Sequence, residues 1–235
     1  MKSFALAALA ATASAYSNSV PIYGTYPGWV KGGNRTGIEL SFFEDMLCSG
    51  CENQNDIFNQ VLDTAWLDGT VRDQVLVKTT PIVLPYHVHS FQVTQVVPLL
   101  MDMCTDDASK CDLLDQYLDY TLTNHSSILS QDISINAFEA SWPDQVEAAI
   151  GVDAYSVSQI YTSHDVHNTN SRVREMWKYA VSRGVNWTPS VFINGVKLDS
   201  NPNSVDQWIN HLNTVYNSQY SHNHVQEVRP TEFTQ

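Results

Sequence analysis

The sequence is poor in basic residues and lacks the motifs of several common protein classes. Its 12 Lys and Arg residues stand against 25 Asp and Glu residues, a formal net charge of −13, so nucleic acid and anionic membranes are poor partners. Gly-x-Ser-x-Gly, Gly-x-Gly-x-x-Gly, His-Glu-x-x-His and a phosphate-binding loop are all absent, and these patterns mark common hydrolases, dinucleotide enzymes, zinc proteases and nucleotide-binding proteins. We therefore expect no cofactor and no metal.

The first 15 residues have the pattern of a secretory signal peptide. Lys2 precedes a short apolar stretch, and Ala13-Ser14-Ala15 fits an Ala-x-Ala cleavage site. No segment offers the roughly 20 apolar residues of a membrane span, and the C-terminus carries no Lys-Asp-Glu-Leu-type retention signal. We therefore expect a soluble mature protein that begins near Tyr16 and is secreted or enters the secretory lumen. Loss of Lys2 would change the net charge from −13 to about −14.

Four cysteines are few, but in a secreted protein an even number favours disulfides. Pairing by proximity predicts Cys48 with Cys51 and Cys104 with Cys111, one of three possible connectivities. Residues seven apart on a continuous helix are about 10 Å apart, which is too far for a disulfide, so residues 105–110 must break the helix. This second pair is then a structural bridge. A zinc site that uses all four cysteines is the less favoured alternative.

Three sequons mark candidate glycosylation sites. They begin at Asn34, Asn124 and Asn186, and in a eukaryote Asn34 and Asn124 would carry glycans on surface loops. Asn186 is less favourable, because its sequon runs directly into Pro189.

Residues 38–51 carry the most informative motif. An apolar run from Ile38 to Phe43 predicts a buried strand, and it delivers Cys48 and Cys51 to the start of a helix that should run to about Leu67. A helix start favours a thiolate, so Cys48 is the predicted nucleophile. Cys51 lies one turn on and could resolve a mixed disulfide. By itself the motif is equally compatible with half a zinc site or a permanent bridge.

A second stretch, residues 184–198, strengthens the redox interpretation. Thr188-Pro189 directly precedes an apolar strand over residues 190–193, which turns at Asn194-Gly195. With the Cys-x-x-Cys segment, this stretch resembles the thioredoxin superfamily. The resemblance implies that Pro189 is a cis-proline beside the thiols and that the backbone of Thr188 pairs with a bound client.

The resemblance extends to the DsbA-like branch through Pro85-Tyr-His-x-x-x-Phe91. A strand within residues 74–85 completes a βαβ unit, so its strand should be parallel to that of residues 38–43. The predicted fold is α/β, a thioredoxin fold with an inserted α-helical subdomain at about residues 90–165. Around this domain, residues 38–216, we expect an extended leader at residues 16–37, with an edge strand near residues 20–23, and a polar tail at residues 217–235.

Within the insertion and beyond it, apolar spacing predicts several helices. Pro98 should interrupt the first of them, and Trp142-Pro143 should start another. A short helix is expected within residues 153–163, and longer ones over residues 171–183 and 205–216.

The predicted function is a secreted thiol-disulfide oxidoreductase whose partners are protein or peptide thiols and disulfides. Ser49 and Gly50 separate the cysteines, where better-known members of the superfamily carry Gly-Pro, Pro-His or Gly-His, so no histidine or proline tunes the thiolate there. Glu39, Glu44 or Asp45 could carry the proton of Cys51. The segment with His87 and His89 could bind metal or carry protons, but a loop and a helix start capped by Ser90 is favoured.

Two other classes stay open. One is a binding or structural thioredoxin-like protein in which the bridge between Cys48 and Cys51 is permanent. The other is a glutathione-using enzyme like the kappa-class transferases, whose chemistry does not need the second cysteine that this sequence retains.

Overall fold

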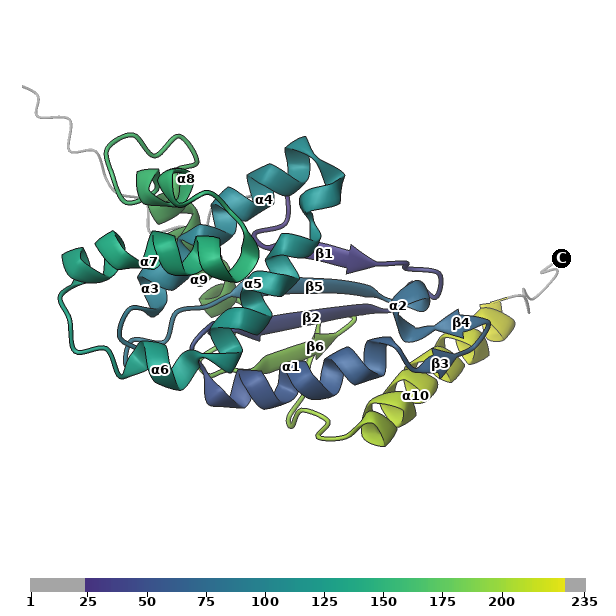
Figure 1. Cartoon of the computed structure of the whole chain (residues 1–235). Coiled ribbons are helices and arrows are strands. Elements are labelled where there is room, and N and C mark those ends of the chain that lie inside the picture. The colour runs from purple at the N-terminus through teal and green to yellow at the C-terminus, as the bar shows by residue number, and fades with distance from the viewer. Residues whose placement is uncertain (1–23, 227–235) are drawn as a thin grey trace, which may run out of the picture.

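A five-stranded mixed sheet forms the centre of the molecule, and the computed structural model describes residues 24–226 of the chain (Figure 1). The strands follow the order β1-β5-β2-β6-β7. Their bounds are β1 Trp29–Gly32, β2 Glu39–Glu44, β5 Leu76–Pro81, β6 Ser190–Ile193 and β7 Val196–Lys197. β2 and β5 are parallel and the other neighbours are antiparallel, which confirms the predicted βαβ unit. A separate hairpin pairs β3 Ala65–Trp66 with β4 Gly69–Thr70.

Helices cover both faces of the sheet and one of its ends. Those next to the sheet are α1 Ser49–Leu62, α2 Val71–Gln74, α9 Thr169–Ser182 and α10 Val205–Gln226. The inserted elements are α3 Ser90–Thr94, α4 Val96–Asp106, η1 Ala108–Lys110, α5 Asp112–Thr123, α6 His125–Leu129, α7 Ile135–Ile150 and α8 Ala154–Gln159. The insertion lies over the end of the sheet from which β2 leads into α1 (Figure 1). The helical subdomain is therefore confirmed.

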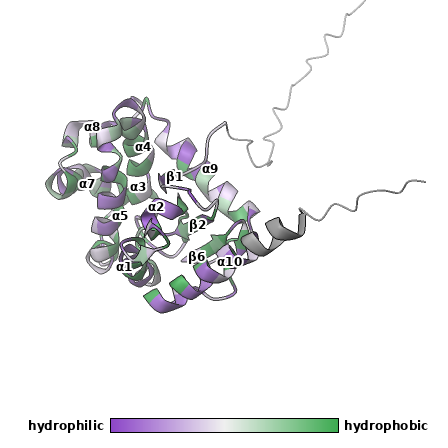
Figure 2. Ribbon diagram, turned by 90° about the vertical axis from the view of Figure 1, so that its right-hand side faces the viewer, coloured by the Kyte–Doolittle hydropathy of each residue, from purple (hydrophilic) through white to green (hydrophobic). Residues whose placement is uncertain are grey.

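The strands alternate their side chains between two apolar layers, as a period of two requires. Phe42 points to the face covered by α1 and α10, where its ring lies 4.3 Å from that of Phe58 and 5.7 Å from that of Trp208. Phe43 points to the opposite face and contacts Tyr179 of α9 and Phe192 of β6. Figure 2 shows the strands between α9 on one side and α1 with α10 on the other. Each face is thus buried by its own helices.

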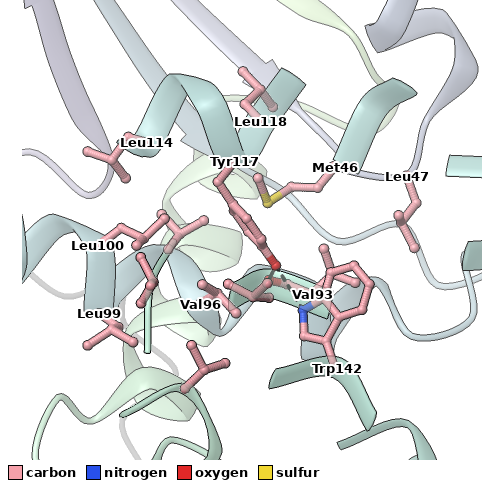
Figure 3. Close-up of a cluster of buried hydrophobic side chains, with 14 of the residues drawn as sticks. Met46, Leu47, Val93, Val96, Leu99, Leu100, Leu114, Tyr117, Leu118 and Trp142 are labelled. Atoms are coloured by element: carbon pink, nitrogen blue, oxygen red, sulfur yellow. Dashed lines mark hydrogen bonds between the residues drawn. The ribbon is translucent and has the colours of Figure 1, made fainter. Parts of the chain in front are cut away.

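The insertion has a core of its own, arranged around two aromatic side chains (Figure 3). Tyr117 of α5 and Trp142 of α7 have no exposed surface. The Tyr117 hydroxyl donates to the carbonyl oxygen of Val93 at 2.7 Å and accepts from the Nε1–H of Trp142 at 3.1 Å. Because buried polar atoms are costly when unpaired, these two bonds fix how α3, α5 and α7 pack together.

Two predicted helix boundaries are wrong. α1 ends at Leu62 and does not reach Leu67, since Leu67 has a left-handed φ of 54° that a helix interior does not adopt. Trp142-Pro143 does not start a helix, because both residues lie inside α7. That helix begins after Ser134, whose Oγ accepts from the N–H of Ala137 at 3.2 Å and caps the helix.

Other predicted helix positions agree with the structure. The interruption predicted for Pro98 is present, as α3 and α4 separate at Gln95 and Pro98 sits in the first turn of α4. The short helix expected within residues 153–163 is α8, and the helices expected over 171–183 and 205–216 are α9 and α10.

The two ends of the described chain differ from expectation in detail. α10 continues to Gln226, so residues 217–226 of the predicted polar tail are helical. The edge strand predicted near residues 20–23 lies outside the described residues, as do the predicted signal peptide and residues 227–235. Within the predicted leader, β1 occupies the edge of the sheet beside β5.

Candidate active site

The turn between β2 and α1 places Cys48 at the helix start. Cys48 is the N-cap of α1, with an extended backbone at φ −92° and ψ 121°. Its carbonyl oxygen accepts hydrogen bonds from the N–H groups of Cys51 at 3.0 Å and Glu52 at 3.1 Å. The side chain of Cys48 therefore lies at the positive end of the helix dipole, where an anion is favoured.

The loop before β6 faces this helix start. The Thr188–Pro189 peptide bond is cis, and the main-chain oxygen of Thr188 lies 3.6 Å from the Sγ of Cys48. A Cβ atom added at Gly50 would lie 3.2 Å from the Cδ of Pro189. The fold thus brings together the two stretches that carry the resemblance, although they are far apart in the sequence.

The two sulfur atoms differ in exposure and in acidity. Cys48 is half-buried and Cys51 fully buried, and both are free. A hydrogen bond from Cys51 lowers the pKa of Cys48 to about 5, against the opposing effect of partial burial, and Thr188 and the N–H groups of the helix start add to the lowering. Burial raises the pKa of Cys51 well above its usual value. At neutral pH the site holds one thiolate and one thiol.

The three carboxylates considered as proton carriers occupy different environments. Glu39, the first residue of β2, is partly exposed and pairs with Lys78. It lies at the end of the strand away from the sulfurs. Glu44 is 3% exposed, and this burial raises its pKa to about 8 although Lys31 lowers it. The charge of Glu44 also raises the pKa of Cys51. Of Glu39 and Glu44, Glu44 is the one whose charge acts on the Cys51 sulfur.

Asp45, the third carboxylate, is completely buried and serves as a structural anchor. Its carboxylate accepts hydrogen bonds from the N–H groups of Leu47 at 2.8 Å and Leu84 at 2.6 Å, and from the hydroxyl of Ser90 at 3.0 Å. It therefore joins the turn before Cys48 to the segment of residues 84–90. Ser90 is committed to this contact and does not cap α3, which corrects the sequence-based assignment.

The two histidines of this segment behave differently. His89 is the N-cap of α3 in a left-handed conformation, and its ring stacks on Phe138 at 4.2 Å. His87 places its Nδ1 3.0 Å from the Oδ1 of Asp45. This close approach of the Asp45 carboxylate raises the pKa of His87 despite partial burial, although the contact lacks the geometry of a hydrogen bond.

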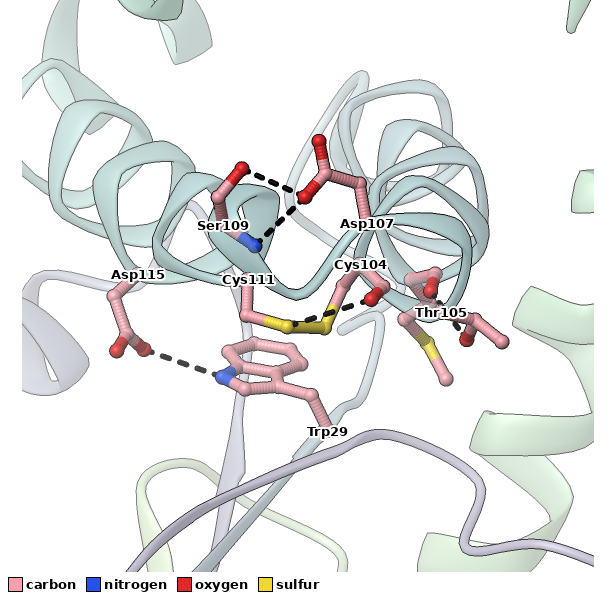
Figure 4. Close-up of a disulfide and its surroundings, with 8 residues drawn as sticks. Trp29, Cys104, Thr105, Asp107, Ser109, Cys111 and Asp115 are labelled. Atoms are coloured by element: carbon pink, nitrogen blue, oxygen red, sulfur yellow. Dashed lines mark hydrogen bonds between the residues drawn. A yellow bond between two sulfur atoms is a disulfide. The ribbon is translucent and has the colours of Figure 1, made fainter.

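The Cys104–Cys111 disulfide lies at the tip of the insertion (Figure 4). It joins α4 to the start of α5, with a Cα–Cα distance of 4.4 Å, and η1 breaks the helix between the cysteines as predicted. The Trp29 ring lies against the bridge, with its Nε1–H donating to Asp115 at 3.2 Å (Figure 4). The pair is closed and packed, so it suits a structural role.

The two favoured sequons lie in different settings. Asn34 is exposed in the link between β1 and β2. Asn124 is partly buried at the end of α5, where its Nδ2 donates to the carbonyl oxygen of Tyr120 at 2.8 Å. Since a glycan attaches at this nitrogen, Asn34 is the more accessible site, and glycosylation stays a prediction for both.

Residues 24–226 contain neither a cluster of metal ligands nor a membrane-spanning helix. No group of three or more His, Cys, Asp or Glu side chains in this range is arranged to hold a metal ion. No helix in this range is long and apolar enough to cross a bilayer.

Comparison with solved structures identifies the fold. DsbA from Chlamydia trachomatis aligns with a TM-score of 0.57 and 15% identity, covering 89% of this chain and 96% of that one. A form of α-DsbA1 from Wolbachia pipientis in which two cysteines are replaced by alanine gives 0.59 and 12%, covering 87% and 96%. Oxidised BdbD from Bacillus subtilis gives 0.57 and 13%, covering 81% and 94%.

At these identities the likeness establishes the fold alone. The chain has the DsbA-like architecture, a thioredoxin fold with a helical insertion, which confirms the predicted fold class. No protein-family model matches the sequence, and no curated protein matches it.

Proposed function

We propose that this protein is a secreted thiol-disulfide oxidoreductase that forms, reduces or reshuffles disulfides in protein or peptide clients through Cys48 and Cys51. One observation carries the proposal: the accessible sulfur has a pKa near 5 and the buried sulfur beside it has a raised one. A permanent bridge has no need of this asymmetry. Thiol-disulfide exchange requires it, because one sulfur must attack or leave as a thiolate.

In the oxidising direction, the Cys48–Cys51 disulfide accepts two electrons from two client thiols. A client thiolate attacks the Sγ of Cys48, and Cys51 leaves as a thiolate and takes up a proton. The second client thiolate then attacks the client sulfur of the mixed disulfide, which closes the client disulfide and releases Cys48 as a thiolate. The reverse sequence reduces a client disulfide.

Glu44 supplies and receives the proton of Cys51 in this scheme. Its pKa of about 8 means that the carboxyl is mostly protonated at neutral pH, so it can donate when Cys51 leaves as a thiolate. In the reverse direction the carboxylate accepts the proton as Cys51 attacks. Such a group works best when its pKa lies near the working pH.

The loop before β6 presents a backbone that a client can use. Ser190 Oγ donates to the carbonyl oxygen of Trp187, and Asn201 Nδ2 donates to that of Pro189, each at 2.8 Å. Within the described residues, the main chain of Thr188 between them makes no hydrogen bond apart from its contact with Cys48. A client strand could pair with Thr188 while its cysteine lies over Cys48.

The direction of the reaction follows from the acidity of Cys48. A stabilised thiolate favours the reduced form of the pair, by about 1.4 kcal/mol for each unit by which the pKa is lowered. The environment of Cys48 therefore favours oxidation of clients, even though Ser49 and Gly50 provide no tuning side chain between the cysteines.

The test is a redox titration of Cys48 and Cys51 in the purified mature protein against glutathione, together with insulin reduction and oxidation of a dithiol peptide. We expect turnover in at least one assay and a disulfide that glutathione can open. A Cys51→Ser variant should accumulate a mixed disulfide with the peptide. Absence of turnover, with a bridge that glutathione cannot open, would replace this proposal by a thioredoxin-like binding protein.

A further inference from the structure

The outer face of α9 carries large apolar side chains that stay exposed in the described chain. Arg174, Trp177 and Val181 are spaced by three and four residues, so they share one side of the helix. Trp177 is 45% exposed and Val181 is 43% exposed, whereas four other positions of α9 are buried. Two large apolar side chains exposed on one helix face favour a contact surface.

This face borders a pocket of about 690 Å³ between α9 and the residues that follow β5. Val83 and Phe91 line the pocket from one side, and Trp177 lines it from the other. Val83 and Phe91 are only partly buried, so both sides of the pocket offer apolar surface. An apolar side chain that enters the pocket is stabilised by leaving water.

The charge around the pocket is opposite in sign to that of the chain. Residues 172–197 carry five Lys or Arg residues and one acidic residue, Glu175, whereas the whole chain carries 12 basic and 25 acidic residues. Arg174, Lys178 and Glu175 all belong to the pocket lining. A basic surface on an otherwise acidic protein favours an acidic partner at this place.

Both cations of the pocket are available to a ligand. The Nε of Arg174 donates to the Oδ1 of Asn170 at 2.9 Å, and neither Arg174 nor Lys178 pairs with a carboxylate of residues 24–226. Arg172, on the same helix, is by contrast held by Asp102 at 2.7 Å. The free guanidinium and ammonium groups can therefore donate to the carboxylates of a bound segment.

The pocket wall is bonded to the redox site through one buried carboxylate. Leu84 and Ser90 are the sequence neighbours of Val83 and Phe91, and both donate to the carboxylate of Asp45, at 2.6 Å and 3.0 Å. These two bonds fix the pocket wall to the end of β2.

The nucleophile is bonded to the same aspartate. The carbonyl oxygen of Asp45 accepts a hydrogen bond from the N–H of Cys48 at 3.0 Å. Tyr86 and Val88, both exposed, lie within the segment that Asp45 holds. Exposed apolar side chains therefore continue from the pocket along the segment that is held against the redox site.

We propose that the pocket between α9 and residues 83–91 is a docking site for clients, and that it selects an acidic client segment with a large apolar side chain. The client carboxylates pair with Arg174 and Lys178, and its apolar side chain lies against Trp177. The client cysteine lies a few residues further on, at Cys48. This inference rests on the proposed function, because it names the class of client that the same redox pair serves.

The first experiment measures docking without exchange. The probes are two cysteine-free peptides, Gly-Asp-Phe-Asp-Gly and Gly-Lys-Phe-Lys-Gly, added to the purified mature protein while NMR records the tryptophan indole N–H signals. We expect the Asp peptide to shift the Trp177 signal, which is assigned by its loss in Trp177→Phe, and to bind at least about threefold more tightly than the Lys peptide. The indole of Trp66, which donates to Asn213 of α10, should not shift. No shift of Trp177, or equal binding of both peptides, would overturn the proposal.

The second experiment measures whether docking selects clients. The probes are two dithiol peptides with the same cysteines, one flanked by Asp-Phe-Asp and the other by Lys-Phe-Lys. We expect the KM for oxidation of the Asp peptide to be about three- to tenfold lower, and this difference should shrink as salt is added. Equal KM values at low salt would contradict the proposal.

Charge reversal locates the selection in the pocket. In Arg174→Glu/Lys178→Glu the preference should reverse, so that the Lys peptide has the lower KM. The matched control Arg35→Glu/Lys110→Glu reverses the same two charges at exposed positions outside this pocket and should keep the wild-type preference. An equal change of preference in both variants, or none in the first, would show that the pocket does not select the peptide.

The docking site and the exchange reaction can fail separately. Binding of the cysteine-free Asp peptide without turnover of either dithiol peptide would support the docking site and remove the proposed exchange. Turnover of both dithiol peptides without any preference would remove the docking site and leave the exchange in place.

Discussion

The two cysteine pairs of this chain show how placement decides the chemistry of the same side chain. Cys48 and Cys51 lie on the first turn of α1, where the helix dipole, a buried carboxyl and the cis-proline loop converge. Cys104 and Cys111 lie at a helix tip, closed into a disulfide against Trp29 (Figure 4). We propose that one pair exchanges electrons with clients, whereas the other joins two helices.

Spacing explains part of this difference. Two residues three apart on a helix share a face, so Cys48 and Cys51 stay close together whether they are bonded or free. Two residues seven apart do not, and the Cys104–Cys111 bridge exists only because η1 interrupts the helix. Opening the second pair would release that constraint on the tip, whereas opening the first leaves α1 intact.

The strongest test of the contrast is removal of each pair in turn. Cys48→Ala should lower client turnover by about a thousandfold or more, because no other group can form the mixed disulfide. The double variant Cys104→Ala/Cys111→Ala should retain turnover within about twofold, since its sulfurs take no part in exchange. Both are measured by peptide oxidation. Comparable losses of turnover in the two variants would show that the two cysteine pairs do not differ in function.

Stability should show the opposite order. Loss of the Cys104–Cys111 bridge frees a short loop and should lower the free energy of unfolding by about 2–3 kcal/mol. Urea denaturation of the double variant, compared with that of Cys48→Ala, measures this. A Cys48→Ala variant as unstable as the double variant would show that the α1 pair is structural as well.

A third substitution probes the insertion without touching either pair. Tyr117→Phe removes the hydroxyl that joins Val93 to Trp142, which leaves a buried donor and a buried acceptor unpaired and should cost about 1–3 kcal/mol. The pKa of Cys48 should not change. Circular dichroism during denaturation and a thiolate titration check the two parts, and a shifted Cys48 midpoint would show that the insertion core sets the thiol environment.

The smallest expected effect concerns Glu44 and pH. Because the pKa of Glu44 is about 8, it acts as an acid below that pH and as a base above it. The step in which Cys51 attacks should therefore accelerate as the pH rises through about 8. Glu44→Gln should slow this step about tenfold, since water can replace the carboxylate in part. Single-turnover reduction of a peptide disulfide over a pH series measures this, and an unchanged inflection would exclude Glu44.

Local sequence signals, together with the family resemblance that they carry, were enough to predict the fold and the two stretches that meet at the site. The apolar run before Cys48 and the proline that opens β6 predicted the strands, since a buried strand and a strand-start proline need only neighbouring residues. The break between Cys104 and Cys111 followed from helix geometry. Each of these depends on a few consecutive positions.

What could not be predicted depends on contacts between distant segments. Glu39, Glu44 and Asp45 looked equivalent in the sequence. Burial separates Glu44 and Asp45 from Glu39, and the hydrogen bonds that Asp45 accepts separate it from Glu44. The role of Asp45 as an anchor for residues 84–90 depends on where the chain goes after β5. Trp142-Pro143 suggested a helix start because proline prefers the first turn, but packing of Trp142 in the insertion core keeps α7 continuous across it.

The acidity of Cys48 is the property on which the proposed exchange chemistry depends most directly. Ultraviolet absorbance of the reduced protein, corrected by that of the oxidised protein, reports the thiolate of the α1 pair as pH is varied, while the Cys104–Cys111 disulfide contributes no titrating thiol. We expect a midpoint at about pH 5 for the first thiol. A midpoint near the usual cysteine value of about 8.5 would contradict it, because Cys48 would then be an ordinary thiol at neutral pH.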